Sequence, residues 1–189
     1  MKIICEVSAR HVHLNATDVE FLFGTGNRLT SFRELSQPGQ FLCNERVDIV
    51  TEKGCFRNVA IIGPERMASQ VEISRTDCFV LGLKNIPIRE SGRIDGTPGI
   101  VLRTGGKELR LDRGVIVAKR HIHVDPKTAK QYDLKNSEER VVRFEGERAG
   151  TLNVVVRVAD NYLPAVHIDT DEANAMGFSS GEVQLETRV

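Results

Sequence analysis

Short runs of β-branched and other apolar residues recur along the chain, and glycine precedes or separates many of them. Examples lie at residues 47–51, 99–102, 114–117 and 151–158. Such spacing favours short strands joined by turns over long helices that alternate with strands. The pattern therefore predicts a mainly β protein built of antiparallel barrels or sandwiches.

Two segments carry the signals of short helices instead. Asn15 is a suitable N-cap for a helix at residues 16–23, which Gly24 ends. Asp125 is a suitable N-cap for a helix at residues 126–132, where proline occupies the favoured first position.

The same order of features occurs twice in the chain. Arg10-His11-Val12-His13 returns as Arg120-His121-Ile122-His123, and each copy is followed by an apolar residue, a cap residue and one of the two short helices. A matched order over about a dozen positions indicates that one β-rich unit was duplicated. The repeat thus predicts two copies of a β-rich unit, each with a short helix, and leaves barrels and sandwiches both open.

Length and charge narrow the class of protein. The chain has 189 residues, which suits one large domain or two small ones. Its 26 basic residues balance 26 acidic residues, so no overall charge favours nucleic acid or an anionic membrane. The apolar runs are too short to span a bilayer, and the first residues lack a secretion signal. We expect a cytoplasmic protein that binds neither nucleic acid nor membrane.

Cysteine spacing gives no sign of a metal site. Cys5, Cys43, Cys55 and Cys78 include no pair at CxxC spacing. In a chain without an export signal, such cysteines are expected to be reduced thiols with structural roles.

Histidine carries the strongest chemical signal, because four of the five histidines lie in the repeated tetrapeptide. In an extended strand, His-X-His places both imidazoles on one face, where they can bind one metal ion. Each pair needs one more protein ligand to form a site with an open coordination position. Zinc suits such ligands, and Co, Fe, Mn and Ni also accept them.

The residues alone leave the third ligand of each pair open. The fifth histidine, His167, can join the second pair, with Asp169 or Asp171 as an acceptor that orients its ring. Asp171 is the residue expected to cap a helix that begins near Glu172. Glu72 lies among apolar residues, where a metal would offset the cost of a buried carboxylate.

Other chemical features are weaker. Arg66 follows a Gly-Pro turn and can form a fork for a phosphate or a carboxylate, although an exposed arginine in that place is ordinary. The chain lacks a phosphate-binding glycine loop, a GxSxG nucleophile elbow, an HExxH helix and a dinucleotide fingerprint. Residues 91–99 form the segment most like a linker.

Five ordered motifs resemble the PduL-type phosphotransacylases, also called phosphate propanoyltransferases, from about residue 6 to about residue 176. The motifs are Ser8-Ala9-Arg10-His11-Val12-His13-Leu14, Leu35-Ser36-Gln37-Pro38-Gly39-Gln40-Phe41, Gln70-Val71-Glu72-Ile73-Ser74, residues 114–123 and residues 167–175. The resemblance implies a zinc-dependent enzyme that interconverts acyl-CoA and phosphate with acyl phosphate and CoA. A propanoyl or acetyl group would be transferred.

The resemblance also implies roles for individual residues and two zinc ions per chain. The implied ligands are His11, His13 and Glu72 for the zinc that meets the CoA sulfur, and His121, His123 and His167 for the zinc that keeps water or phosphate. Arg66 looks like the catalytic residue that holds phosphate. Ser8, Arg33 and Asn174 fall where the family contacts CoA.

The same resemblance implies the fold, two similar antiparallel β-barrel domains with short capping α-helices, and the domain boundaries. Residues 10–118 would form the first β-barrel domain, and residues 119–189 the second, completed by the strand at residues 1–9, with the site between them. Where the family is expected to place a basic CoA contact, this chain has Ala60, although Arg57 lies nearby. Members packaged into bacterial microcompartments, as in propanediol degradation, carry an N-terminal extension. This chain looks like an unencapsulated form.

Phosphate is already an anion at neutral pH, so the reaction calls for placement and charge stabilisation more than for a strong base. We expect sequential kinetics through a ternary complex, without an acyl-enzyme, in a homodimer or a higher homo-oligomer.

Two alternative functions stay open. A zinc-dependent esterase or thioesterase would use water in place of phosphate. In a non-catalytic metal-binding module, replacing Arg66 would change neither the metal content nor any measured activity.

Overall fold

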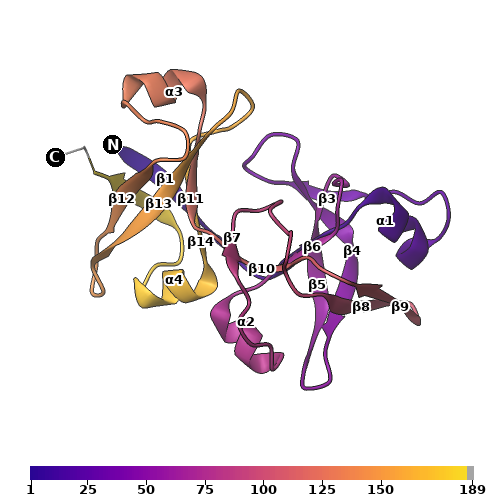
Figure 1. Ribbon diagram of the computed structural model, residues 1–189. Coiled ribbons are helices and arrows are strands. Elements are labelled where there is room, and N and C mark those ends of the chain that lie inside the picture. The colour runs from indigo at the N-terminus through magenta and orange to yellow at the C-terminus, as the bar shows by residue number, and fades with distance from the viewer. Residues whose placement is uncertain (187–189) are drawn as a thin grey trace. The chain divides into compact units, whose positions relative to one another are not determined.

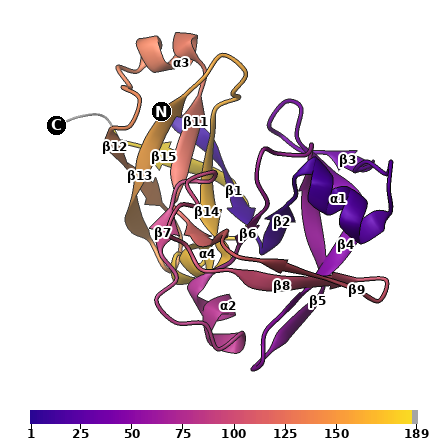
Figure 2. The same cartoon turned by 45° about the vertical axis from the view of Figure 1, so that its right-hand side comes forward.

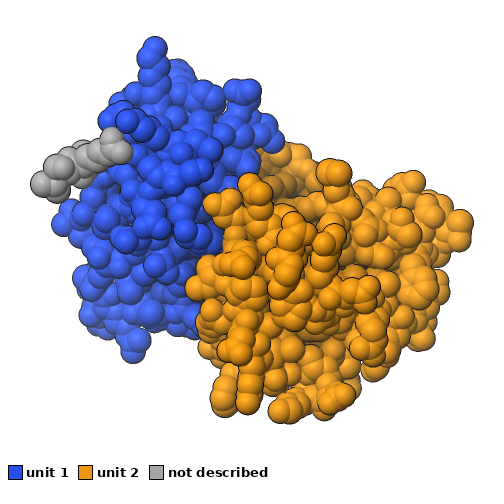
Figure 3. Space-filling model, in the orientation of Figure 1, with its two compact units in different colours: residues 1–9, 119–189 blue, residues 10–118 orange. Residues whose placement is uncertain are grey.

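The computed structural model describes residues 1–186 and divides into two compact units (Figure 3). The barrel unit consists of Met1–Ala9 together with the described residues from Lys119 onward, and the sheet unit consists of Arg10–Ala118. Each unit contains one of the two Arg-His-X-His segments.

Six strands of the barrel unit form a closed barrel in the order β1-β14-β11-β13-β12-β15. The strands are β1 (Lys2–Ser8), β11 (His121–Val124), β12 (Glu139–Phe144), β13 (Gly150–Val158), β14 (Ala165–Asp169) and β15 (Gly181–Leu185). Strand β1 pairs in parallel with β14, and β11 pairs in parallel with β13. Fully buried side chains such as Ile122, Val156 and Val166 fill the interior.

Two short helices, α3 (Pro126–Gln131) and α4 (Thr170–Ala175), lie near opposite ends of the barrel strands (Figures 1 and 2). The Asp125 side chain caps α3 by accepting a hydrogen bond from the Thr128 amide, as the sequence predicts. Helix α4 begins with a capping box formed by Asp169 and Glu172. The prediction that Asp171 is the cap is therefore wrong.

The sheet unit contains a curled sheet of nine strands. Eight follow the order β7-β10-β6-β2-β5-β4-β8-β9, and β3 pairs with β4. The strands are β2 (His11–His13), β3 (Ser31–Glu34), β4 (Phe41–Val50), β5 (Cys55–Gly63), β6 (Gln70–Glu72), β7 (Ile88–Arg89), β8 (Ile100–Thr104), β9 (Lys107–Leu111) and β10 (Val115–Ala118).

Helices α1 (Ala16–Phe23) and α2 (Arg75–Val80) belong to the sheet unit. The Asn15 side chain caps α1, and Gly24 ends it at a φ of 114°, a left-handed conformation that favours glycine. Ser74 and Asp77 form a capping box at the start of α2. Within the described residues, no helix is both long and apolar enough to cross a membrane.

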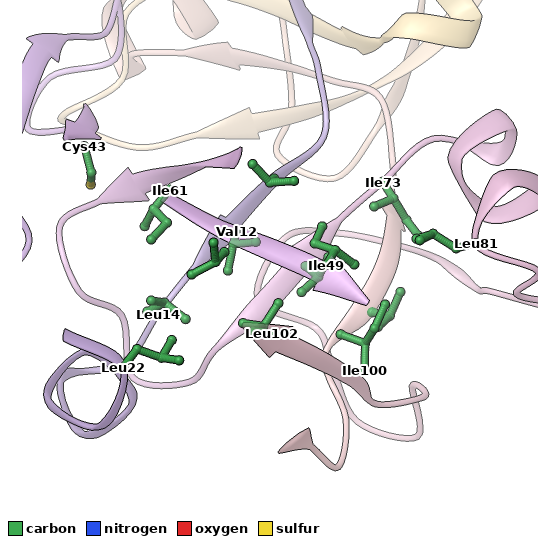
Figure 4. Close-up of a cluster of buried hydrophobic side chains, with 14 of the residues drawn as sticks. Val12, Leu14, Leu22, Cys43, Ile49, Ile61, Ile73, Leu81, Ile100 and Leu102 are labelled. Carbon is green, nitrogen blue, oxygen red and sulfur yellow. The ribbon is translucent and has the colours of Figure 1, made fainter. Parts of the chain in front are cut away.

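One hydrophobic cluster holds the sheet unit together (Figure 4). Val12 on β2, Ile61 on β5 and Val71 on β6 are fully buried on the same side of the sheet, where Leu102 from β8 joins them. Because side chains alternate along a strand, packing of Val12 and Val71 against this core turns their neighbours to the opposite face.

These findings confirm a mainly β fold and both helices predicted after the repeated segments. The prediction of purely antiparallel pairing is wrong, because β2 and β11 each have one parallel and one antiparallel neighbour. Strand direction could not be inferred, since apolar alternation is the same either way. One sheet closes into a barrel and the other is curled and open, so two similar barrels are not confirmed.

All four cysteines are free, as the sequence predicts. Cys5, Cys43 and Cys78 are buried, whereas Cys55 is exposed. The buried thiols therefore act as small apolar side chains of the two cores.

Candidate metal centres

The pairing of β2 with β6 builds the first cluster of potential metal ligands. The strands run antiparallel, with His11 opposite Glu72 and His13 opposite Gln70. Because Val12 faces the core, both imidazoles face the other side of the sheet, where the Glu72 carboxylate joins them. All three ligand residues are buried.

Distances within this cluster suit a small cation. The Nε2 atom of His11 lies 3.6 Å from Oε2 of Glu72, and Nε2 of His13 lies 3.5 Å from Oε1. Tetrahedral zinc with bonds of about 2.0–2.1 Å separates its ligand atoms by roughly 3.3 Å. The Nδ1 atom of His13 donates to the Ile62 carbonyl at 3.0 Å, so its Nε2 keeps the lone pair that a metal needs.

Two neighbours hold the Glu72 carboxylate in place. Gln70 Nε2 and Ser91 Oγ both donate to Oε1 of Glu72 at 2.6 Å, which leaves Oε2 directed at His11. The Gly92 amide in turn donates to Oε1 of Gln70. Residues 91–99, which look like a linker in the sequence, thus lie within the sheet unit and support a candidate ligand.

Burial determines the charge state of this cluster. It lowers the pKa of His13 to about 4, so the ring is neutral at pH 7 and able to bind a metal. Burial acts to raise the pKa of Glu72, but the adjoining His11 and His13 hold that pKa well below its usual range. The cluster therefore presents an ionised carboxylate and at least one neutral imidazole.

Strands β11 and β14 build the second cluster in the same way. His121 lies opposite His167 and His123 lies opposite Ala165 in an antiparallel pair. Ile122 and Val166 face the barrel interior, so the imidazoles project from the outer face of the barrel wall. The ring centroids of His123 and His167 are 4.8 Å apart.

In this cluster, the Nδ1 atoms of His121 and His167 each lie near an oxygen that can accept a hydrogen bond. His121 Nδ1 donates to the Lys119 carbonyl at 2.9 Å, and His167 Nδ1 lies 3.5 Å from Oε2 of Glu6. Glu6 is directly opposite His167 on β1, the neighbouring strand. The sequence offered Asp169 or Asp171 for this role, and the Asp169 carboxylate caps α4 instead.

His123 gives the clearest sign that the cluster fits a metal. Its ring stacks on Tyr162, with centroids 3.9 Å apart, and among the described residues neither ring nitrogen has a hydrogen-bond partner. Burial, reinforced by His121 and His167, lowers the pKa of His123 to about 2. A buried neutral imidazole without a partner is costly, and a metal ion would remove that cost.

Both clusters therefore contain the ligand residues that the sequence predicts. In each cluster, the three ligand atoms all lie within 4.8 Å of one another. Three protein ligands are the usual number at a catalytic zinc, where a fourth position stays open for water or substrate. The donors fit zinc, and their chemistry also accepts the other divalent metals named above.

Comparison with known proteins identifies the family. The sequence profile of phosphate propanoyltransferases matches residues 4–179. A phosphate propanoyltransferase of Enterococcus faecalis is 49% identical over 177 residues, which cover 93% of this chain and 83% of that protein. The phosphate propanoyltransferases of Leptotrichia buccalis and Listeria monocytogenes are each 50% identical to this chain. Both matches again cover 93% of this chain and 83% of the other protein. The chain belongs to the phosphate propanoyltransferase family. It is an acyltransferase.

Arg66, the predicted phosphate-binding residue of this acyltransferase, lies beside the first cluster. Its Nη1 atom donates to Ser91 Oγ at 2.8 Å, and Ser91 in turn donates to Glu72. Its backbone amide donates to the Leu14 carbonyl, one residue beyond the His11–His13 strand. The guanidinium is thus connected to a candidate metal ligand through one hydroxyl group.

The three predicted CoA contacts are divided between the units. Ser8 ends β1 opposite Asp169, and Asn174 is exposed on α4, so both belong to the barrel unit. Arg33 is exposed on β3 of the sheet unit. Ala60, the departure from the family pattern, lies beside His11 in the sheet and opposite Arg46 on β4.

Sequence reasoning missed the residues that orient the ligands. Gln70, Ser91, Glu6 and Tyr162 all contact a ligand side chain. Only Gln70 carried a usable signal, because a residue two positions before Glu72 must share its face of the strand. Each of the other three lies far in sequence from the ligand that it contacts: Glu6 contacts His167, Tyr162 contacts His123 and Ser91 contacts Glu72.

Proposed function

We propose that this protein transfers a short acyl group, propanoyl or acetyl, from CoA to phosphate and catalyses the reverse reaction, with two zinc ions bound at the two clusters. The observation that carries the proposal is the chain of contacts from Arg66 through Ser91 to Glu72 beside one of two open three-ligand clusters. The name of its relatives, phosphate propanoyltransferase, supports propanoyl as an acyl group.

Metal ions bound at these clusters would supply Lewis acidity for the anionic phosphate and for the thiolate that departs from the thioester. The Arg66 guanidinium binds phosphate through charge-assisted hydrogen bonds and orients one of its oxygens. Ser91 accepts from Arg66 and so limits the rotamers of that side chain. This preorganisation lowers the entropic cost of reaching the attack geometry.

The reaction needs no covalent acyl-enzyme. A phosphate oxygen attacks the carbonyl carbon of the thioester, the carbon–sulfur bond breaks, and its electron pair leaves with the thiolate of CoA. Phosphate is already ionised, so the chain need not supply a strong base. The expected kinetics are sequential, and a trapped acyl-enzyme would contradict this scheme.

CoA recognition forms the second part of the proposal. Ser8, Arg33 and Asn174 are the proposed contacts. Arg57 compensates for the absence of a basic side chain at Ala60, because a β-bulge near Asn58 keeps residues 57 and 60 on one side of β5. Replacing Arg57 with alanine should raise the KM for acyl-CoA and leave the KM for phosphate unchanged.

Three further features belong to the proposal. We assign domain boundaries at residues 10–118 and 119–189, the latter completed by residues 1–9, and derive both domains from one duplicated unit. The assembly is a homodimer or a higher homo-oligomer, which light scattering after gel filtration would test. The location is cytoplasmic, which cell fractionation would test.

The decisive experiment measures release of CoA thiol from acetyl-, propanoyl- and butanoyl-CoA by zinc-loaded protein, with and without phosphate. We expect release to require phosphate and to yield an equal amount of acyl phosphate. Equal rates without phosphate would indicate a hydrolase and overturn the proposal. The His123→Ala protein serves as the inactive comparison, and the exposed Cys55→Ser protein as the active one.

A further inference from the structure

The arginine that precedes each His-X-His segment contacts an acidic residue of a helix and a neighbouring strand in both units. Arg10 donates from Nε and Nη2 to Oδ1 of Asp77, at 3.0 and 2.7 Å. Arg120 donates from Nη1 to Oε1 of Glu172 at 2.8 Å. Neither arginine is a candidate metal ligand.

The two acidic partners occupy equivalent positions. Asp77 is the third residue of α2, and its other oxygen accepts from the Ser74 amide. Glu172 is the third residue of α4, and its other oxygen accepts from the Asp169 amide. Each acid therefore closes a capping box with one oxygen and binds an arginine with the other.

The capping residues lie at a fixed distance from the third ligands. Glu72 precedes the N-cap Ser74 by two residues, and His167 precedes the N-cap Asp169 by two residues. An arginine at the start of each His-X-His strand is thus tied to the segment that presents the third ligand.

Each arginine also contacts the strand that lies parallel to its own. The Arg10 guanidinium stacks 4.0 Å above the centroid of the Phe56 ring on β5. Arg120 Nε donates to the Asn153 carbonyl on β13. The arginine therefore connects three neighbouring segments in each unit.

We propose that Arg10 and Arg120 are positioning residues that hold each third ligand in register with its histidine pair, Arg10 for Glu72 and Arg120 for His167. This inference rests on the proposed metal sites and adds a role that the ligands themselves do not reveal. Strands β2 and β6 share only three paired positions, so pairing alone constrains their register weakly.

The consequence of lost register is severe in a strand. A slip by one residue turns each side chain to the opposite face, so Glu72 would leave the histidines and enter the core. A smaller shift would move the carboxylate out of bonding range of the ion. The arginines oppose both changes from outside the ligand set, as partners of metal ligands do at many metal sites.

The test uses proteins with one metal site each. His123→Ala retains the intact His11–His13–Glu72 site, and His13→Ala retains the intact His121–His123–His167 site. Zinc affinity is measured in each background by competition with a chromophoric chelator. We expect Arg10→Ala to weaken zinc binding about 10- to 100-fold in the first background only, and Arg120→Ala to do so in the second only.

Controls separate positioning from general loss of stability. Arg103→Ala and Arg143→Ala remove exposed arginines that pair with Glu108 and Glu186, one in each unit, and should not change either affinity. Arg10→Lys and Arg120→Lys retain the charge but lack the planar fork, so they should give intermediate affinities. They also cover the case in which an alanine variant does not fold.

The outcomes distinguish this inference from the proposed function. Equal weakening at both sites, or an unchanged affinity with a lower melting temperature, would overturn the positioning role. Absence of zinc binding in both backgrounds would overturn it together with the metal sites. The role stands if the site-selective losses occur, even in a protein that releases CoA without phosphate.

Discussion

In the sheet unit, the third ligand is a carboxylate that Gln70 and Ser91 fix by hydrogen bonds, whereas in the barrel unit it is the imidazole of His167, backed by Glu6. Both ligands lie opposite the first histidine of a His-X-His strand. The third ligand therefore has the same position relative to the histidine pair in both units, and the two sites differ in whether that ligand is Glu72 or His167.

That difference changes the charge left on a bound ion. One carboxylate cancels part of the charge of a divalent ion, so the Glu72 site keeps about one positive charge, while three neutral imidazoles leave about two. The His167 site should attract an anion such as phosphate more strongly. We assign the sulfur of CoA to the Glu72 site, as the family resemblance implies.

The largest expected effects come from removing one histidine at each site. His13→Ala and His123→Ala should each lower kcat/KM by at least about 1000-fold, because each site loses a ligand needed for tight metal binding. Metal analysis should show that each variant loses about one equivalent of zinc. A variant that keeps full activity without its metal would remove that site from the mechanism.

Replacing Arg66 tests whether phosphate binding can be lost while metal binding is retained. Arg66→Ala should lower kcat/KM for phosphate by about 100- to 1000-fold, because a charged donor at the reacting anion is lost. Zinc content should stay at two equivalents, since Arg66 reaches Glu72 only through Ser91. Loss of zinc in this variant would show that Arg66 is structural.

Local sequence patterns predicted the two histidine pairs and two helices, whereas the complete sets of three ligands came from the family resemblance. His-X-His spacing and N-caps such as Asn15 act within a few residues. The parallel pairing of β2 with β5 could not be inferred, since it joins His11 to Ala60, about fifty residues away. Ser91 and Tyr162 were missed for the same reason: nothing near them in sequence indicates the ring or carboxylate that they contact.

A smaller effect should separate the residues that orient the two third ligands. Ser91→Ala removes a hydrogen bond from Glu72, and Glu6→Gln removes the charge beside His167. Each should weaken zinc binding about 10-fold at its own site and leave the other site unchanged. Zinc competition in the single-site proteins would measure this, and an equal effect of Ser91→Ala on both sites would contradict the comparison.

The smallest effect concerns the thiols of the two units. Burial raises the pKa of both Cys5 and Cys43 to about 12, so their thiolate fraction is very small at pH 8. Alkylation of native protein by iodoacetamide should therefore label exposed Cys55 first and leave zinc content unchanged. Mass spectrometry of tryptic peptides would locate the label. Early modification of Cys5 or Cys43 would show that a core opens readily.

The division of tasks between the two clusters can be read directly with Co²⁺, whose absorption reports a bound thiolate through a charge-transfer band. Co²⁺ is added at one equivalent to the His123→Ala protein, which retains the Glu72 site, and to the His13→Ala protein, which retains the His167 site. CoA is then titrated into both. We predict a thiolate–cobalt band in the first protein only. A band of equal strength in both proteins, or only in the second, would contradict the assignment of CoA sulfur to the Glu72 site.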